Sequence, residues 1–572
     1  MLRFINFILL SVFTFTVVCQ PSFPGASGFG ASATGGRGGK VIYVTNLNAS
    51  GPGSLQDALN QSGTRYILFK VSGVIPATIK VPNGNGNFTI AGQTSPSGII
   101  VRGLEMYNEE NPSVSNVIVR HIRSRIGDRN KYPSMHWIAE DGITIGGVHN
   151  AIFDHCSFAH ASDEAVDISR SSGITIQHCI LGETLGSHAD LGGMLINYSS
   201  AQSRLDSLSI IYNIWNRIGG RMPEISCETP YCNGKTINIE LSNNLFWDPH
   251  IELWYEGLTG FNGNFFLRMN AVNNLFHARP TYGNGMFHFD LLNYAQNQFF
   301  IAGNRINLYY PEYSDYQLFY CCNDFNTSHP NTNFGIAQKA SMRFNFPSVY
   351  YHPVESLRDL MYQQAGAFPR DPMDRRLMSY VKEEIIPGLP VSIAGADDTF
   401  MLNQSITFPA DSDMDGMPDY WEMYQGLNPT EQDHNQTGLS QMITGISGYT
   451  NLECYLNCLS DALVSGQSSP ECGITFTLSN EDISSNSDLK LKLMPNPAKD
   501  QIKIELPEGI SIYEPIELLI TDGSGKRVFR SSYECCTIQL DLQDFVKGMY
   551  VAEVRSAYSG IRIAKGDLVV LK

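Results

Sequence analysis

Short apolar runs bounded by glycine, asparagine or aspartate recur along the chain from about residue 40 to residue 310. Runs of this length with turn residues at both ends are typical of β-strands. No helical pattern separates one run from the next, which argues against a sheet built from βαβ units. The clearest runs are residues 87–90, 117–123, 142–145, 151–158, 173–181, 208–215, 237–246, 270–276 and 299–306.

A single column of residues gives these runs a common register. Aligning the runs on their final apolar pair places in that column Cys156, Cys179, Asn213, Asn244, Asn274 and Asn304. Asparagine tolerates the left-handed conformation that a tight corner needs, and stacked amides can hydrogen-bond along the stack. Repetition at this period, with asparagine at a corner, predicts an all-β fold: a right-handed, single-stranded parallel β-helix. A β-sandwich with coincidental asparagine pairs is the alternative.

The two ends of the chain depart from this repeat. The first nineteen residues carry Arg3, an apolar run and then Cys19, which predicts a secretory signal peptide too short to span a membrane. A lipid-anchored Cys19 is the alternative, although Val18 stands where a lipid-attachment signal prefers a small residue. Residues 488–572 alternate apolar and polar positions and predict a small β-sandwich.

Residues 411–422 read DSDMDGMPDYWE and place acidic side chains at positions one, three, five, nine and twelve, with Gly416 at six. This is calcium-loop spacing, in which alternate oxygens converge on one ion and glycine permits the sharp turn. We expect a structural calcium here, and a merely solvated acidic turn is the alternative. The expected ligands are Asp411, Asp413, Asp415, Asp419 and Glu422.

These patterns divide the chain into five parts. Residues 350–395 lose the strand pattern and are expected to form a loop-and-helix flank on the solenoid. The predicted parts are a signal peptide (1–19), the β-helix domain (20–395), a calcium-loop appendage (396–470), a Ser/Asn-rich linker (471–487) and a C-terminal β-sandwich (488–572).

The composition of the chain argues against several classes of function. The formal net charge is −17 and no Lys/Arg run occurs, which argues against nucleic acid as a partner because its binding depends on basic side chains. No further segment approaches the length of a membrane span. Cys227 and Cys232 flank a short loop and form the best disulfide candidate, while no CxxC pair of zinc type occurs. We expect a monomer.

Acidic residues gather on one predicted face of the β-helix. Asp141 opens the run DGITI, and Asp163 and Asp167 lie one coil later in SDEAVDIS. Asp163 and Arg221 follow their own column residues by nearly the same number of positions, so they should line one face, roughly 10 Å apart across two coils. Clustered carboxylates suit calcium, whereas the alternative for each aspartate is a solvated turn residue.

The chain resembles polysaccharide lyase family 1, the pectate lyases, over roughly residues 24–310. The resemblance lies in PGASGFGASATGGRGGKVIYVTNLNASGPGSLQDAL, FTIAGQTSPSGIIVRG, NVIVRHIRSRIGD and NAIFDHCSFAHASDEAVDIS. It implies calcium-dependent cleavage of pectate (polygalacturonate) by β-elimination, in which the C5 proton is removed and the C4 oxygen is expelled. Such a reaction needs a cation to neutralise the substrate carboxylate.

The resemblance also implies roles for particular residues. Asp141, Asp163 and Asp167 take the positions of the calcium-binding carboxylates, and Arg221, in GGRMPEIS, resembles the arginine that removes the C5 proton. Guanidinium groups hardly lose their proton, and the family's alkaline optimum is the implied answer. Asp154 and His155 resemble a supporting Asp-His pair beside the groove.

Two substrate-binding positions differ from the family pattern. The family's second arginine is Ser226 here, and the expected lysine is missing from ETLGSHADLGGM. His188 is our substrate-binding candidate in its place, with Lys235 as an alternative. Pectin lyases, which need no calcium, are disfavoured because all three carboxylates are retained. The remaining alternatives are a polygalacturonase-type hydrolase, which uses paired aspartates, and a catalytically weakened glycan-binding surface protein.

The C-terminal sequence carries a second resemblance. LMPNPAKDQIKIEL, ITDGSGKRV and LDLQDFVKGMYVAEV resemble the sorting domain of the Bacteroidetes type IX secretion system. This implies a secretion machinery as partner and a secreted or cell-surface location. The segment DSDMDGMPDYWEMYQGLNP with GYTNLECYLN likewise resembles a calcium-loop appendage found after such lyase domains.

Overall fold

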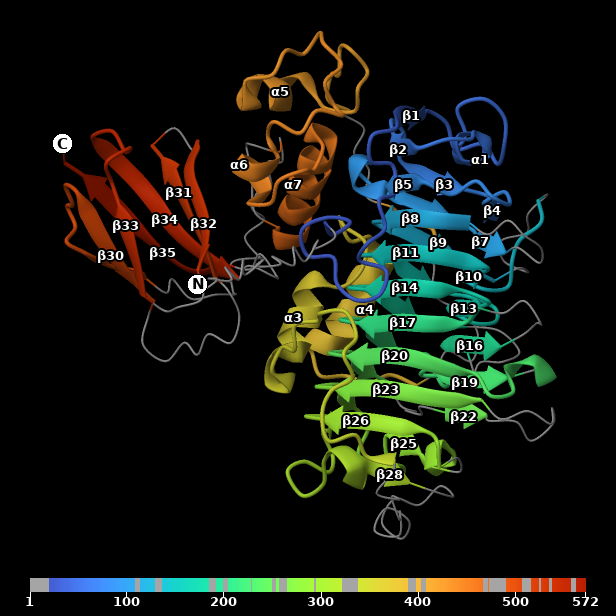
Figure 1. The fold of residues 1–572 in the computed structure, drawn as a ribbon. Helices are drawn as coiled ribbons and strands as arrows, with labels where there is room; N and C mark the ends of the chain where they lie inside the picture. The colour runs from blue at the N-terminus through green and yellow to red at the C-terminus, as the bar shows by residue number, and fades with distance from the viewer. Residues whose placement is uncertain are drawn as a thin grey trace, which may run out of the picture.

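The computed structural model is a long parallel β-helix with short helices along one side and a separate antiparallel domain at the C-terminus (Figure 1). It describes residues 20–107, 114–128, 136–184, 192–198, 204–227, 229–248, 254–256, 265–292, 295–320, 338–388, 398–402, 408–466, 472, 490–506, 516–523, 526–533, 537–556 and 562–571. The predicted signal peptide lies outside these residues, and so does the predicted linker apart from Cys472. Among the helices so described, none is long and apolar enough to cross a membrane.

Three parallel sheets form the walls of the β-helix. Sheet A contains β1 (Lys40–Val44), β2 (Arg65–Phe69), β5 (Phe88–Ala91), β8 (Val114–Arg120), β11 (Val148–Asp154), β14 (Ser172–Gln177), β17 (Asp206–Ile211), β20 (Thr236–Ser242), β23 (Phe266–Val272) and β26 (Gln298–Ala302). Sheet B contains β3 (Gly73–Ile75), β6 (Ile99–Val101), β9 (Ile122–Arg125), β12 (Ser157–Ala159), β15 (Ile180–Gly182), β18 (Ile214–Asn216), β21 (Leu245–Trp247), β24 (Leu275–His277) and β27 (Arg305–Ile306). Sheet C contains β4 (Ile79–Lys80), β7 (Leu104–Tyr107), β10 (Ile143–Gly146), β13 (Val166–Ser169), β16 (Met194–Tyr198), β19 (Glu224–Cys227) and β22 (Trp254–Glu256).

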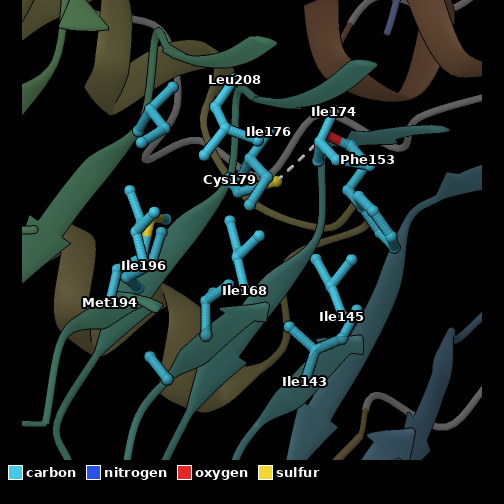
Figure 2. Close-up of a cluster of buried hydrophobic side chains, with 14 of the residues drawn as sticks. Ile143, Ile145, Phe153, Ile168, Ile174, Ile176, Cys179, Met194, Ile196 and Leu208 are labelled. Atoms are coloured by element: carbon cyan, nitrogen blue, oxygen red, sulfur yellow. Dashed lines mark hydrogen bonds between the residues drawn. The ribbon is translucent and has the colours of Figure 1, made fainter. Parts of the chain in front are cut away.

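The strands follow one another as A, B, C in each coil, so a strand pairs in parallel with its equivalent in the next coil. Alternate residues point inward: Ile143 and Ile145 of β10 are fully buried, while Thr144 between them is partly exposed. Figure 2 shows such side chains of sheet C facing Phe153, Ile176 and other residues of sheet A. Burying each one contributes about 1.5–3 kcal/mol before chain entropy is counted.

The predicted column of residues forms a hydrogen-bonded ladder at the corner between sheets A and B. The Nδ2 of Asn213 donates to Asn244 Oδ1 (3.2 Å), Asn244 to Asn274 (3.1 Å) and Asn274 to Asn304 (2.8 Å). The ladder residues are buried, and the left-handed position belongs to the residue before each, such as Asn243 (φ 53°) and Asn273 (φ 51°). Amide stacking was therefore predicted correctly, but the corner strain lies one residue earlier.

In the earlier coils, the left-handed corner residues stack their rings on the outside. His155 lies 5.2 Å from His121 and 4.8 Å from His178, and His178 lies 4.9 Å from Tyr212, measured between ring centroids. Asp154 beneath them is fully buried and accepts hydrogen bonds from Arg120 Nε and Gln177 Nε2, both at 2.8 Å. The Asp154–His155 pair thus lies within a packed corner of sheets A and B, away from the outer face of sheet C.

Helices cover two outer faces of the solenoid. α3 (Leu357–Gln364) and α4 (Pro372–Lys382) pack Leu357, Met361 and Leu377 against the outside of sheet B. This is the predicted loop-and-helix flank. α5 (Asp419–Gln425), α6 (Ser440–Thr444) and α7 (Asn451–Ser465) form a helical segment that packs on Tyr66, Leu68 and Ala91 in the first coils of sheet A. We refer to it as the calcium-loop segment, after the sequence pattern of residues 411–422. α1 (Leu55–Asn60) lies beside those first coils.

The C-terminal domain has its own apolar core between two antiparallel sheets. One sheet contains β29 (Lys492–Met494), β30 (Gln501–Glu505) and β33 (Thr537–Asp541). The other contains β31 (Ile516–Asp522), β32 (Arg527–Tyr533), β34 (Gly548–Ser556) and β35 (Arg562–Val570). Outside this domain, the short strands β25 (Phe287–His288) and β28 (Phe319–Tyr320) pair with each other at the end of the β-helix. The predicted fold class, a parallel β-helix followed by a small β-sandwich, is confirmed.

Candidate active site on the outer face of sheet C

Strand register aligns two rows of side chains along the outer face of sheet C. The first outer row comprises Lys80, Glu105, Thr144, Asp167, Leu195 and Glu224. The second outer row, two residues further along each strand, comprises Tyr107, Gly146, Ser169, Asn197 and Ser226. The face therefore has an edge where the strands begin, next to the first row, and an opposite edge where they end, next to the second.

An acidic group lies at the edge where the strands begin. Carboxylate oxygens of Asp141, Asp163 and Glu164 all lie within 4.8 Å of one another. The loop that carries them is held by the backbone N–H groups of residues 162 and 163, which donate to the Glu140 carbonyl at 2.9 and 3.1 Å. The group draws on two successive coils, because Asp141 precedes β10 and the other two precede β13.

Burial raises the pKa of Asp141 to about 7. The hydroxyl of Thr144 donates to Asp141 Oδ2 (2.8 Å), which lowers this pKa, whereas the nearby charge of Asp163 raises it further. Carboxylates held this close repel one another, and a divalent cation removes that repulsion. The donor set of hard oxygens therefore fits calcium.

Asp167 lies apart from this acidic group. It occupies the first outer row of β13, paired in register with Thr144 of β10 and Leu195 of β16. Glu164 belongs to the acidic group, and we did not predict it. The sequence signal was present, since Glu164 directly follows Asp163, but a carboxylate in a loop has no strand register from which its direction can be inferred.

Arg221 reaches the acidic group from the side of the next coils. Its Nη1 pairs with Glu164 Oε1, and its Nε donates to Glu224 Oε2 at 2.7 Å. Gly192 and Gly193 occupy the coil between Arg221 and Glu164, and a side chain at Gly193 would lie 2.1 Å from the Arg221 carbonyl oxygen. The expected separation of roughly 10 Å between Asp163 and Arg221 is an estimate for two coils of backbone, without the reach of the side chains. The long guanidinium chain closes that gap through the neighbouring Glu164.

Of the two suggested substitutes for the missing lysine, only Lys235 lies among the described residues. His188 lies outside the described residues. Lys235 lines a separate open cleft of about 690 Å³ at the start of the sheet A strands, together with His149, Tyr198 and Arg204. Ser226 stands in the second outer row, where the resembling family carries its second arginine.

The calcium-loop segment gathers a second acidic group. Asp411, Asp413 and Asp415 bring carboxylate oxygens within 4.8 Å of one another, and Asp415 does the same with Glu422 and Asp433. Burial, together with the charges of Asp415 and Asp413, raises the pKa of Glu422 to about 8. Both Glu422 oxygens are buried without a hydrogen-bond partner in the described part of the chain. Oxygens arranged in this way fit a calcium ion.

Of the five predicted ligands of this loop, Asp419 belongs to neither acidic triplet, whereas Asp433, which was not predicted, belongs to one. Asp419 turns away and accepts hydrogen bonds from the backbone N–H and the hydroxyl of Ser412, both at 2.7 Å. Asp433 takes part instead, although it lies outside the twelve-residue spacing that the sequence pattern covers. The hydroxyl of Tyr43, in β1, donates to Asp411, so the loop is also fastened to the first coil.

The described disulfides are Cys227–Cys232, as predicted, and Cys458–Cys472, which joins α7 to a residue after it. Cys156 and Cys179 of the ladder and Cys454 of α7 are buried free thiols. None of the described cysteines belongs to a potential metal-binding group.

Comparisons with known proteins cover both major parts of the chain. Residues 492–563 match the family model of the secretion system C-terminal sorting domain. The chain is 31 % identical over 458 residues to the probable pectate lyase C of Aspergillus flavus, covering 77 % of this chain and 94 % of that protein. It is 30 % identical over 467 residues to the probable pectate lyase C of Aspergillus fumigatus, covering 79 % and 96 %. The crystal structure of Jun a 1, the major allergen from cedar pollen, aligns at 18 % identity with a TM-score of 0.40, covering 60 % of this chain and 92 % of that one.

Proposed function

Since the chain belongs to the pectate lyase family, we propose that it cleaves pectate (polygalacturonate) by calcium-dependent β-elimination, as a monomer. The protein is a polysaccharide lyase with a C-terminal sorting domain, which directs it to the cell surface or the extracellular space. The proposal depends chiefly on one observation: Arg221 lies against a group of carboxylates on the outer face of sheet C.

Asp141, Asp163 and Glu164 are the residues that would hold the calcium, with Asp167 on the adjoining first row as a further carboxylate. Calcium bound there would link these carboxylates to the carboxylate of a uronate sugar and neutralise it, which makes the C5 proton more acidic. On a protein of net charge −17, it also provides attraction for an acidic polymer.

Arg221 is the proposed base. In elimination the C5–H electrons form the C4–C5 double bond, the C4–O bond breaks, and the departing oxygen takes a proton. Arg221 must leave Glu164 to reach the sugar, since its Nη1 is engaged there. Glu224, in the first outer row, still accepts the hydrogen bond from Arg221 Nε and so sets the direction in which the guanidinium can turn. Because guanidinium groups hold their proton strongly, the reaction is expected to be fastest at alkaline pH.

The test is an assay of the full chain on polygalacturonate. With calcium, ultraviolet absorbance from the unsaturated product should rise, and excess EDTA should abolish the rise until calcium is added back. New reducing ends without that absorbance would indicate a hydrolase. Binding of the polymer without either signal would indicate a glycan-binding protein that has lost activity. Full turnover in EDTA would overturn the calcium mechanism.

The calcium-loop group of Asp411, Asp413, Asp415, Glu422 and Asp433 belongs to the proposal as a structural site. It lies in the segment that packs on sheet A, whereas the catalytic group lies on sheet C. The same proposal divides the chain into a signal peptide, the β-helix domain (20–395), the calcium-loop appendage (396–470), a linker and the C-terminal β-sandwich (488–572).

A further inference from the structure

Arg170 is a buried cation on the catalytic face with too few partners. It directly follows Ser169 of the second outer row and is only 6 % exposed. Its Nε and Nη2 are both buried and have no hydrogen-bond partner anywhere in the described chain. Burial of an unpaired charge is costly, so a protein that keeps one normally gives it an anion to bind.

The surrounding residues hold Arg170 in a fixed place. Its guanidinium carbon lies 4.4 Å from the centroid of the Tyr107 ring, which supports one face of the group by cation–π attraction. Tyr107 in turn lies across Gly146, where an added Cβ would stand 2.5 Å from its ring carbon Cδ2. The ring covers a face of the guanidinium and leaves the N–H donors of Nε and Nη2 unused. The guanidinium group of Arg170 is therefore held in position, but no described carboxylate neutralises its charge.

Two neighbours on the second outer row also lack partners. Asn197 and Ser226 are at most 5 % exposed, and Asn197 Oδ1 and Ser226 Oγ have no hydrogen-bond partner among the described residues. Asn197 aligns with Ser169 and Ser226 aligns with Asn197, so the row continues from Arg170 along the helix axis. A planar guanidinium fork matches a carboxylate, while a hydroxyl and an amide match sugar hydroxyls.

The distance of Arg170 from the acidic group suits two neighbouring sugars of one polymer. Arg170 lies three residues after Asp167, directly past the end of β13, so its backbone is roughly 10 Å along the chain from the first outer row and the acidic group beyond it. A polyuronate carries one carboxylate per sugar, so a chain whose reacting sugar lies at the acidic group places another carboxylate at about this distance. Ser226 supplies no charge in this row, whereas Arg170 does.

We propose that Arg170 binds a carboxylate of the polyuronate on a sugar next to the one that reacts, with Asn197 and Ser226 contacting that sugar's hydroxyls. Arg170 is thus a specificity residue that favours unesterified substrate. This inference rests on the proposed function, because it takes the substrate to be a polyuronate bound across sheet C.

The experiment compares Arg170→Gln, Arg170→Lys and a control, Arg268→Gln, in the calcium-loaded full chain. Arg268 is an exposed arginine on sheet A that donates to Gln298. Loss of a charge-assisted contact made equally in the ground and transition states should raise KM for polygalacturonate about tenfold in Arg170→Gln and leave kcat within about twofold. Arg170→Lys should recover part of the loss, and Arg268→Gln should match the wild type.

Methyl-esterified pectin supplies the second readout. Esterification removes the charge that Arg170 would bind, so KM for highly esterified pectin should be the same for Arg170→Gln and the wild type. A merely structural role would instead lower the thermal unfolding midpoint and affect both substrates alike. Either that result or an unchanged KM for polygalacturonate would overturn the inference.

Calorimetric binding of trigalacturonate separates this inference from the proposed function. If the wild type binds trigalacturonate about tenfold more tightly than Arg170→Gln but releases no unsaturated product, the lyase proposal fails and the role of Arg170 stands. If the wild type cleaves polygalacturonate and both proteins bind trigalacturonate equally, the role of Arg170 fails and the lyase proposal stands. If the wild type neither binds nor cleaves, both fail.

Discussion

Arg221 makes two ion pairs with carboxylates that stand in different coils, Glu164 on one side and Glu224 on the other. Sequence spacing placed Arg221 on the right face because strand register carries an offset from one coil to the next. It did not identify Glu164, whose direction is set by a loop. Asp433 was missed for a related reason: it reaches the calcium loop through tertiary packing, and no local spacing encodes that contact.

Arg221→Lys should lower kcat on polygalacturonate by at least about a hundredfold, close to 2.7 kcal/mol in the barrier, with KM almost unchanged. Lysine keeps the charge but loses the planar fork that pairs with Glu164 and Glu224 together. Arg217→Lys is a matched control, since Arg217 pairs with Glu183 outside the acidic group. If the Arg221 variant kept more than about a tenth of wild-type turnover, Arg221 would not be the base.

Calcium should bind the catalytic group more tightly as pH rises from 6 to 8. The pKa of Asp141 is raised to about 7, so calcium competes with a proton in this range. In metal-free protein, the raised pKa contributes stability that is fully present below about pH 4 and is lost as pH rises through 7. The calcium concentration for half-maximal activity should therefore fall over this interval. The same titration of Asp141→Asn should lose most of this pH dependence, and a wild-type value that does not change with pH would contradict the assignment.

The asparagine ladder is the element whose existence could be inferred from sequence alone. The ladder can be recognised in the sequence by its period of 30 or 31 residues in the last coils, because each ladder amide must face the equivalent amide of the next coil. The same ladder changes to Cys156 and Cys179 in earlier coils, where the backbone N–H of Cys179 still donates to Asn213 Oδ1 at 2.9 Å. The outward corner residues could not be inferred, because histidine, tyrosine and asparagine all occupy that left-handed position.

Asn274→Ala should destabilise the protein by about 3 kcal/mol, since it leaves several buried groups unpaired. The Asn274 side chain accepts from both the backbone N–H and the Nδ2 of Asn244, and it donates to the Leu241 carbonyl. Chemical denaturation followed by circular dichroism measures the loss. Asn60→Ala, which removes only an exposed hydrogen bond with Gln56, should change stability by less than about 0.5 kcal/mol. Equal effects of the two substitutions would mean that the ladder adds nothing specific.

The molecule as a whole is proposed to use calcium twice, and the two uses can be separated. Glu422→Gln should reduce the rise in thermal unfolding midpoint that calcium causes, because both Glu422 oxygens are buried in the loop group. The calcium dependence of turnover should stay at the wild-type value in this variant, since the catalytic carboxylates are on sheet C. Asp163→Asn should show the converse pattern. A variant that lost both effects together would indicate a single shared site.

Deletion of residues 488–572 should leave a purified enzyme with wild-type turnover that fails to leave the periplasm. The sorting domain has its own apolar core and its own pair of sheets, so we expect the β-helix to fold without it. Fractionation of cells expressing the truncated chain measures the location, and the ultraviolet assay measures turnover. Normal export of the truncated protein would show that another segment directs secretion.

The calcium-loop segment lies on the first coils of the solenoid, far along the chain from them. α7 ends at Ser465 and lies on β2, β5 and β8, where Tyr66 hydroxyl contacts Thr450 (3.0 Å) and Arg120 Nη2 donates to Ser460 (2.8 Å) (Figure 1). The end of α7 thus lies beside the first coils, although the last β-helix strand precedes it by more than a hundred residues. A molecule held by its tail would stand on its first coil with its final coils outermost. A pulling force on the tail would then act first on the first coils and not on the asparagine ladder. A force applied at the final coil would instead break the ladder hydrogen bonds one coil at a time.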